Sequence, residues 1–365
     1  MIVVHFPSWF PDAEKPLNGN FILRQIAVAD ESTTSVILHH AADHFVPELP
    51  DNVVFHRVAA TSKIKLSKAY VEAFDQIIAQ YGKPDIIHLH VALPLGPIAA
   101  YLANKHHIPL IVSEHWSIYQ PMNRHAIHLY QKWLLHYVYK TAKHVTAVSQ
   151  NLLNNICATV PVAARKPRTV VGNVVNSRLF SLKDNDLQSS KKQILHVSTL
   201  DNDAKNIMGI LRAIQQLSSQ RSDFELNIVH DFENKEAEDF VKSNRLSDIV
   251  HFLGRKSSSE IAELLHHSVC FLLFSNYENQ PCVLLESFCT GTPVVATTVG
   301  GIPEIANNDN ALLVSPKDES QLVEKLNFML DHTGDYQPER IRENALKICS
   351  PEVIWEKWME IYHSL

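Results

Sequence analysis

The sequence predicts an α/β protein of two domains, each a parallel β-sheet flanked by helices. At 365 residues the chain exceeds the usual size of one hydrophobic core. Short apolar runs alternate with amphipathic segments of helical length, which is the pattern of parallel sheets covered by helices. A polar stretch over residues 181–192 lacks apolar periodicity, separates two such series, and indicates a linker.

The first series predicts six short apolar strands with helices between them. The strands are expected at 2–6, 34–39, 85–90, 110–113, 144–148 and 169–171. The helices are expected at 21–29, 67–81, 97–106, 126–143 and 150–158.

The second series repeats this alternation after the linker. Its strands are expected at 193–197, 225–230, 249–253, 269–274, 293–296 and 311–314. Near the end, Trp355, Trp358, Ile361 and Tyr362 share one face of a final helix, a stripe typical of core packing. Ligands of parallel α/β sheets bind beyond the carboxyl ends of the strands, so candidate site residues are sought in the loops that follow strands.

Composition excludes several classes of protein. Apolar residues make up 45% of the chain, but no apolar run reaches the roughly 18–20 residues of a membrane span. The N-terminus shows no signal-peptide pattern, and the five cysteines form no C-x-x-C pair. We therefore expect a cytoplasmic protein without a disulfide framework or a zinc site.

The net charge of −6 is unevenly distributed. Residues 1–175 hold 15 Lys and Arg against 11 Asp and Glu, or +4, and the remainder holds 18 against 28, or −10. An acidic chain with a mildly basic first half is not typical of a nucleic-acid binder. The asymmetry suits an anionic acceptor or a membrane surface facing the first half, although chance explains it equally well.

The most informative segment runs from Phe274 to Glu304. A buried strand is expected to end near Ser275, Glu278 lies in the next loop, and Pro281 suits the entry of a helix that carries Glu286. A helix N-terminus offers N–H groups and a positive dipole end to a diphosphate, while carboxylates accept hydrogen bonds from sugar hydroxyls. A nucleotide sugar contains both kinds of group.

The pattern E-x7-E (Glu278 and Glu286), then G-T-P-V-V-A-T (291–297) and G-G-I-P-E (300–304), resembles the donor-binding region of retaining glycosyltransferases of family 4, which have the GT-B fold. The resemblance extends over most of the chain. It includes P-D-I-I-H-L-H (84–90), V-S-E-H (112–115), A-V-S (147–149), G-N-V-V-N (172–176) and the segment from Leu195 to Asn206.

This resemblance implies two Rossmann-like domains with sheets facing an interdomain cleft. The expected boundaries are 1–178 for an acceptor-binding domain, 179–349 for a donor-binding domain, and 350–365 for a helix crossing back to the first. The implied reaction moves a hexose or N-acetylhexosamine from a UDP-sugar, or alternatively a GDP-sugar, to a saccharide or lipid-linked acceptor with retention. Synthesis of cell-surface polysaccharide or lipopolysaccharide is the expected context.

The resemblance also implies roles for individual residues. His115, Glu278 and Lys205 are the expected catalytic residues, with Glu286 on the donor ribose, Glu278 on the sugar hydroxyls and Lys205 on the diphosphate. The full expected donor set is Gly19, Ser198, Thr199, Lys205, Gly254, Arg255, Glu278, Asn279, Gln280, Val283, Leu284 and Glu286.

Two departures from the family pattern concern the donor. Asn279-Gln280-Pro281 replaces the usual G-F-G, and Pro281 has no N–H with which to contact the sugar. Ser198-Thr199 stands where the family usually has a phosphate-binding arginine, which leaves Lys205 to neutralise the phosphates.

No metal or other cofactor is expected. The triplets Asp184-Asn-Asp186 and Asp201-Asn-Asp203 match the D-x-D form of metal-dependent transferases, but such triplets are common and both are interpreted as chance. One of His88 and His90 is expected to pack within the sheet. A site role for His115 is favoured over a purely structural one.

A stretch over 123–144 places Arg124, Lys132, Lys140 and Lys143 among tyrosines and Trp133. It is interpreted first as an ordinary helix with a core face, and alternatively as peripheral contact with the inner face of a membrane. Two alternative functions also stay open: a GT-B nucleotide-sugar epimerase, and a non-catalytic sugar-nucleotide binder. The sequence does not indicate an oligomeric state.

Overall fold

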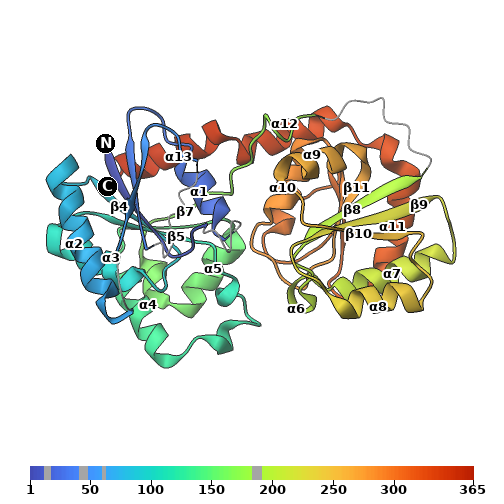
Figure 1. The fold of residues 1–365 in the computed structure, drawn as a ribbon, viewed down its shortest axis with the longest axis horizontal. Helices are drawn as coiled ribbons and strands as arrows, with labels where there is room; N and C mark the ends of the chain where they lie inside the picture. Colours follow the sequence, from blue (N-terminus) through green and yellow to red (C-terminus); the bar gives the residue numbers. More distant parts are fainter. Residues whose placement is uncertain (12–17, 41–47, 60–62, 183–190) are drawn as a thin grey trace. The chain divides into compact units, whose positions relative to one another are not determined.

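The structure is a computed structural model that describes residues 1–11, 18–40, 48–59, 63–182 and 191–365 (Figure 1). The chain forms two compact units, residues 1–174 with 351–365 and residues 175–350. Each unit contains one parallel sheet, so the α/β class predicted from the sequence is confirmed. The predicted linker and the triplet at 184–186 lie largely outside the described residues.

The first unit contains a seven-stranded parallel sheet in the order β3-β2-β1-β4-β5-β6-β7. Its strands are β1 (Ile2–Pro7), β2 (Thr34–His39), β3 (Val53–Arg57), β4 (Ile86–His90), β5 (Leu110–Glu114), β6 (His144–Ala147) and β7 (Arg168–Val170). The helices are α1 (Asn20–Ile26), α2 (Lys63–Tyr81), α3 (Gly96–His106), α4 (Leu129–Thr141), α5 (Gln150–Thr159) and α13 (Pro351–His363). The chain order reverses between β1 and β4, which places a topological switch point there.

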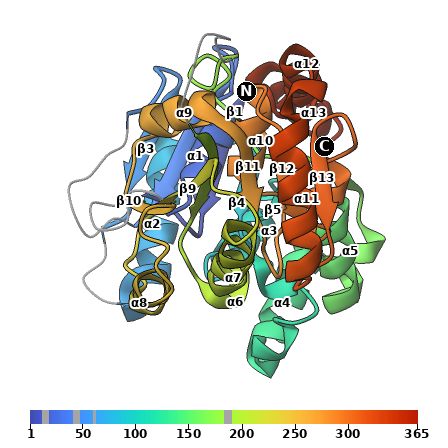
Figure 2. The ribbon, with the colours of Figure 1, turned by 90° about the vertical axis from the view of Figure 1, so that its right-hand side faces the viewer.

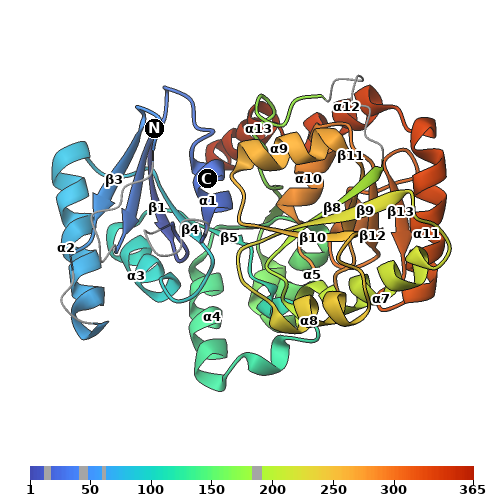
Figure 3. The same ribbon diagram turned by 45° about the vertical axis from the view of Figure 1, so that its right-hand side comes forward.

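The last helix packs on the sheet of this first unit (Figure 3). Trp358 and Tyr362 of α13 are buried with Val3 and Ile111 in one apolar cluster. The Tyr362 hydroxyl lies 2.8 Å from Nδ1 of His88. The predicted stripe on the final helix is therefore a core face.

The second unit contains a six-stranded parallel sheet in the order β10-β9-β8-β11-β12-β13. Its strands are β8 (Lys192–Ser198), β9 (Phe224–His230), β10 (Val250–Gly254), β11 (Ser268–Leu273), β12 (Val294–Thr297) and β13 (Ala311–Val314). The helices are α6 (Asn202–Lys205), α7 (Ile207–Ser218), α8 (Lys235–Ser243), α9 (Ser258–His267), α10 (Cys282–Cys289), α11 (Glu319–His332) and α12 (Pro338–Cys349). In Figure 2, α11 runs beside β12 and β13.

The chain enters this second unit before the predicted boundary at 178/179. The Val175 N–H donates to the carbonyl of Cys349 at 3.0 Å, and the buried Phe180 packs in the second core. These contacts attach residues 175–180 to the second unit.

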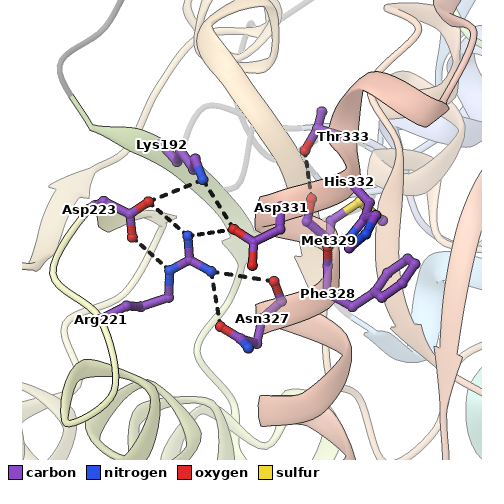
Figure 4. A network of polar contacts seen from close by, with 9 residues as sticks. All are labelled: Lys192, Arg221, Asp223, Asn327, Phe328, Met329, Asp331, His332 and Thr333. Carbon is purple, nitrogen blue, oxygen red and sulfur yellow. Dashed lines mark hydrogen bonds and ion pairs between the residues drawn. The ribbon is translucent and has the colours of Figure 1, made fainter.

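An ion-pair network lies at the amino end of the second sheet (Figure 4). The Arg221 guanidinium donates to both carboxylate oxygens of Asp223, at 2.6 and 2.7 Å, and to Asp331 at 2.9 Å. Lys192 lies 3.1 Å from Asp223. Hydrogen bonds from Arg221 lower the pKa of Asp223 and of Asp331 below the usual range. The network joins β8, the start of β9 and the end of α11.

The structure contains one strand that the sequence analysis missed, β3. It pairs with β2 at the edge of the sheet, and only its first residue, Val53, is fully buried. An edge strand with little buried surface shows a weak apolar pattern, which is why periodicity did not indicate it.

Candidate active site

An ion pair beyond the carboxyl ends of the two central strands of the second sheet joins two segments far apart in sequence. Lys205 Nζ, at the end of α6, lies 2.5 Å from Oε1 of Glu278, in the loop after β11. The Ser275 hydroxyl donates to the same oxygen at 2.8 Å. The two side chains of the pair are mostly buried, 22% and 9% exposed. Because β8 and β11 are neighbours at the point where strand order reverses, their following loops meet there.

Backbone contacts hold α6 against the same loop. The Asn276 N–H donates to the carbonyl of Ala204 at 2.8 Å, and the Asn276 side chain donates to the carbonyl of Asp203 at 3.0 Å. These bonds keep the helix that carries Lys205 beside Glu278.

The glycine loop after β12 touches the Glu278 loop at its backbone. Gly300 has φ of 56°, and a Cβ at this position would lie 1.7 Å from the carbonyl oxygen of Glu278. The Gly301 N–H donates to the carbonyl of Asn279 at 2.8 Å. Thr297 adds a hydrogen bond to the carbonyl of Ser275 at 2.7 Å. Only glycine fits at position 300, so the G-G pair sets the shape of the loop that carries Glu278.

Glu286 lies on α10, which begins directly after Pro281. The side chain is nearly buried, with 5% of the residue exposed. The helix starts and ends where the Pro and Gly residues predicted, with Gly291 just past its end. Leu284 is fully buried in the core, so a donor contact from this position would involve its backbone; Val283 is partly buried.

Ser198, one of the expected donor-binding residues, forms its hydrogen bonds within the protein. The partner of Ser198 is His196, a buried residue that the sequence analysis missed. Nδ1 of His196 lies 2.8 Å from the carbonyl oxygen of Leu272, and Nε2 lies 2.7 Å from the hydroxyl of Ser198. A carbonyl only accepts, so Nδ1 carries the proton and Ser198 donates to Nε2. Burial lowers the pKa of His196 to about 4, which keeps the ring neutral. Ser198 therefore organises the end of β8.

The other expected donor residues of this unit also follow strands. Thr199 is exposed after β8. Gly254 ends β10 with φ of 65°, and open space lies where its Cβ would be. The next residue, Arg255, is half-exposed, and its Nε lies 3.1 Å from a carboxylate oxygen of Asp231, which follows β9. Asn279 and Gln280 are half-buried between Glu278 and α10. Asp201 caps α6 by accepting from the Asp203 N–H at 3.0 Å, which gives this carboxylate a structural task.

The two expected residues of the first unit lie after β1 and β5. Gly19 has φ of 69° at the start of α1, and a Cβ there would clash with the carbonyl oxygen of Trp9. Pro16 and Leu17, which precede Asn18 and Gly19 in the sequence, lie outside the described residues. His115 is 9% exposed and its ring packs against Phe21, with centroids 4.8 Å apart. Burial lowers the pKa of His115 to about 3.

A buried carboxylate that the sequence analysis did not single out, Glu114, organises the loops beside His115. Its carboxylate accepts from the N–H groups of Ala92, at 2.8 Å, and His115, at 3.1 Å, and from the hydroxyl of Tyr119, at 3.0 Å. Burial raises the pKa of Glu114. Its hydrogen bonds connect the loop after β4 to the loop after β5.

Within the described residues, one group of three potential metal ligands comes together: His5, His88 and His90. Both His88 and His90 are buried, where only one of them was expected to pack within the sheet. His5 bonds to His90 at 3.1 Å and to Ser35 at 3.3 Å, and His88 bonds to Tyr362 and Ser113. Burial lowers the pKa of each of the three. Hydrogen bonds to neighbours thus occupy most of the ring nitrogens of this group.

Comparison with known proteins identifies the family. The model for glycosyl transferases group 1 matches residues 177–348, and the model for glycosyltransferase family 4 matches residues 30–178. The chain is 27% identical over 302 residues to the N-acetyl-alpha-D-glucosaminyl L-malate synthase of Bacillus anthracis, covering 79% of this chain and 77% of that protein.

Solved structures show the same fold. Anabaena HepE in complex with UDP superposes with a TM-score of 0.79 at 18% identity, covering 100% of both chains. Sucrose-phosphate synthase from Thermosynechococcus elongatus superposes with a TM-score of 0.78 at 17% identity, covering 100% of this chain and 99% of that one. With the two family models matched in succession along the chain, the protein belongs to the group 1 glycosyltransferases of GT-B fold.

Proposed function

We propose that this glycosyltransferase uses a nucleotide sugar, with a UDP-sugar favoured over a GDP-sugar, as the donor of a hexose or N-acetylhexosamine. The observation that carries the proposal is the Lys205–Glu278 pair beside the start of α10. A cation and a helix N-terminus suit a diphosphate, and a fixed carboxylate suits sugar hydroxyls. The likeness to HepE, a protein crystallised with UDP, supports the choice of base.

The proposed mechanism relies on stabilising the departing diphosphate. Lys205 and the N–H groups at the start of α10 would bear the negative charge that develops as the glycosidic bond to phosphate breaks. Glu278 would orient the transferred sugar, and Glu286 would accept hydrogen bonds from the ribose. We propose retention of anomeric configuration, with the leaving phosphate assisting deprotonation of the acceptor and with His115 acting on the donor or acceptor.

The acceptor we propose is a saccharide or a lipid-linked saccharide, in the synthesis of surface polysaccharide or lipopolysaccharide. The Bacillus relative is named for transfer to L-malate, so acceptors differ within the family. Among the described residues, no helix has the length and hydropathy to cross a membrane. We propose a cytoplasmic enzyme whose activity needs no metal ion.

The proposal is tested first by the donor. A thermal-shift panel of UDP-, GDP- and ADP-sugars is expected to show the largest stabilisation with UDP-sugars, and NMR of the product is expected to show a retained anomeric centre. A product that is an epimerised nucleotide sugar, or tight binding without turnover after a screen of saccharide and lipid-linked acceptors, would contradict transfer and favour one of the two alternatives.

Variants then separate nucleotide from sugar recognition. Glu286→Ala and Lys205→Ala are expected to weaken donor binding by roughly 10–100-fold, since a charged hydrogen bond contributes about 1.5–3 kcal/mol. Glu278→Gln is expected to lower turnover much more than affinity for free UDP, which lacks the sugar. Exposed Lys235 and Glu263 provide matched controls, and their alanine variants are expected to bind the donor as the parent does. Unchanged donor affinity in both Glu286→Ala and Lys205→Ala would refute the placement of the nucleotide.

A further inference from the structure

The first unit carries an exposed apolar patch at the start of α4. We define it by Leu129, Tyr130 and Trp133, which are 84%, 64% and 73% exposed. Leu129 and Trp133 are one helical turn apart and share a face, and Tyr130 lies beside them. Trp133 is exposed, whereas the other four tryptophans are half-buried or buried. Side chains of this size in water, grouped together, indicate an interaction surface.

The same helix has an opposite face that packs normally. Leu135, Val138 and Tyr139 are buried in the core of the unit. The exposed apolar side chains are therefore additional to the core stripe that folding requires, and the sequence-based interpretation of this segment as an ordinary amphipathic helix explains only the buried face.

The surroundings of the patch are positively charged. Continuing along the exposed face, Lys132, His136 and Lys140 are all exposed, and Lys143 follows the helix. Among the described residues, none of these three lysines forms an ion pair with a carboxylate within 4 Å. Lys166 lies against the end of the helix and donates to the carbonyl of Lys140 at 2.6 Å.

The sequence around the helix contains no opposing charge. No Asp or Glu occurs between Glu114 and Asp184, whereas this interval contains Arg124, Lys132, Lys140, Lys143, Arg165, Lys166, Arg168, Arg178 and Lys183. The charge asymmetry of the first half is thus concentrated in the segment that forms α4, α5 and the neighbouring turns. An anionic partner is favoured by this arrangement.

We infer that the start of α4 docks on an anionic phospholipid surface. Apolar and aromatic side chains that enter the headgroup region, next to lysines that contact lipid phosphates, are the features of a helix that lies on a membrane. A second copy of the chain is the weaker candidate, because a two-fold contact through this patch would bring the lysines around it on one copy near those on the other. This inference does not depend on donor binding. It rests on the proposed function only in that membrane docking would bring the enzyme to a lipid-linked acceptor.

The test uses the full chain and vesicles without donor or acceptor. Sedimentation with vesicles of phosphatidylcholine containing phosphatidylglycerol is expected to capture the protein, and pure phosphatidylcholine is expected to bind it at least about 10-fold more weakly. A blue shift of tryptophan emission is expected on binding, and the Trp133→Phe variant is expected to lose it.

Three variants assign the effect to the patch. Leu129→Gln with Trp133→Gln is expected to reduce partitioning by at least about 10-fold on anionic vesicles. Lys132→Gln with Lys140→Gln is expected to reduce it by roughly fivefold for each cation and to shrink the preference for anionic lipid. Phe328→Gln removes an apolar side chain that is 46% exposed in the other unit, and it is expected to leave partitioning unchanged.

The outcomes separate this inference from the proposed function. Vesicle binding lost in the patch variants, with the UDP-sugar thermal shift retained, supports the inference. Binding of UDP-sugar without binding of anionic vesicles overturns the inference and leaves the proposed function standing. A concentration-dependent dimer in sedimentation velocity that Leu129→Gln with Trp133→Gln abolishes, without vesicle binding, also overturns it and assigns the patch to a second copy.

Discussion

Acid is expected to destabilise the first unit more than the second, because its buried histidines must stay neutral. His5, His88, His90 and His115 are each at most 9% exposed. Burial lowers the pKa of His5 and of His115 to about 3, and it lowers the pKa values of His88 and His90 well below 6.5. In the second unit, His196 is the one described histidine with a lowered pKa, of about 4.

The sign and the size follow from proton linkage. A histidine of the unfolded chain binds a proton near pH 6.5, whereas the folded form of His5 or His115 does so only near pH 3. Unfolding therefore takes up protons between these values, and the free energy of unfolding falls as the pH drops below about 6.5. At pH 5 each of the two contributes a loss of about 2 kcal/mol, or about 4 kcal/mol together. Domains are typically stable by about 5–15 kcal/mol, so this loss is large.

The chain offers a local reporter for this measurement. All five tryptophans, at positions 9, 116, 133, 355 and 358, belong to the first unit. Urea unfolding followed by tryptophan emission at pH 7.5 and pH 5 thus reports that unit, and hydrogen exchange of the second sheet reports the other. A fluorescence-detected stability that is equal at the two pH values would refute the reasoning.

A substitution assigns the effect to particular rings. His5→Asn is expected to reduce the difference in the free energy of unfolding between pH 7.5 and pH 5 by about 2 kcal/mol, even where it lowers stability at both pH values. His136→Asn, at an exposed position, is expected to leave the difference unchanged.

Three further results are expected. Gly300→Ala should lower donor affinity at least about 10-fold, because the added Cβ cannot fit beside the Glu278 carbonyl. Gly334→Ala, at a position with open space, should leave donor affinity unchanged. Equal donor affinities of the two variants in a calorimetric titration would contradict this. Arg221→Gln should lower the melting temperature of the second unit by a few degrees with donor affinity unchanged, whereas Arg340→Gln, which removes an exposed pair, should have little effect. Activity should survive EDTA; complete loss that manganese restores would instead direct attention to Asp201 and Asp203.

The sequence predicted those parts of the fold that local chemistry determines. Apolar runs indicated nearly all strands, and Pro281 and Gly291 marked the two ends of α10 correctly. The order of strands in each sheet is a long-range property that periodicity does not contain. For this reason the pairing of Lys205 with Glu278, 73 residues apart, was not foreseen.

Three buried polar residues show a second limit of sequence patterns. His196 and His88 occur within apolar strands, and Glu114 ends one, so a pattern shows only a polar residue next to buried positions. Their tasks depend on partners such as the Leu272 carbonyl and the Tyr362 hydroxyl, which tertiary structure alone brings near. A polar residue within an otherwise apolar strand is a usable signal, because such a group is buried only with hydrogen-bond partners.

Ser198, at the end of β8, bears on the role of Lys205 as the cation of this site. With Ser198 donating to His196, this position supplies no cation and no hydroxyl proton to a ligand. Lys205 uses one of its three N–H donors on Glu278, and among the described residues the structure shows no acceptor for the other two. In the proposed function, the ammonium group would contact both Glu278, the carboxylate proposed to orient the sugar, and the departing phosphate. We propose that this lysine serves both parts of donor recognition, by holding Glu278 in place for the sugar and by offering its two remaining N–H donors to the phosphate. A lysine is a compact cation with rotatable donors, which suits such bridging better than the planar fork of an arginine.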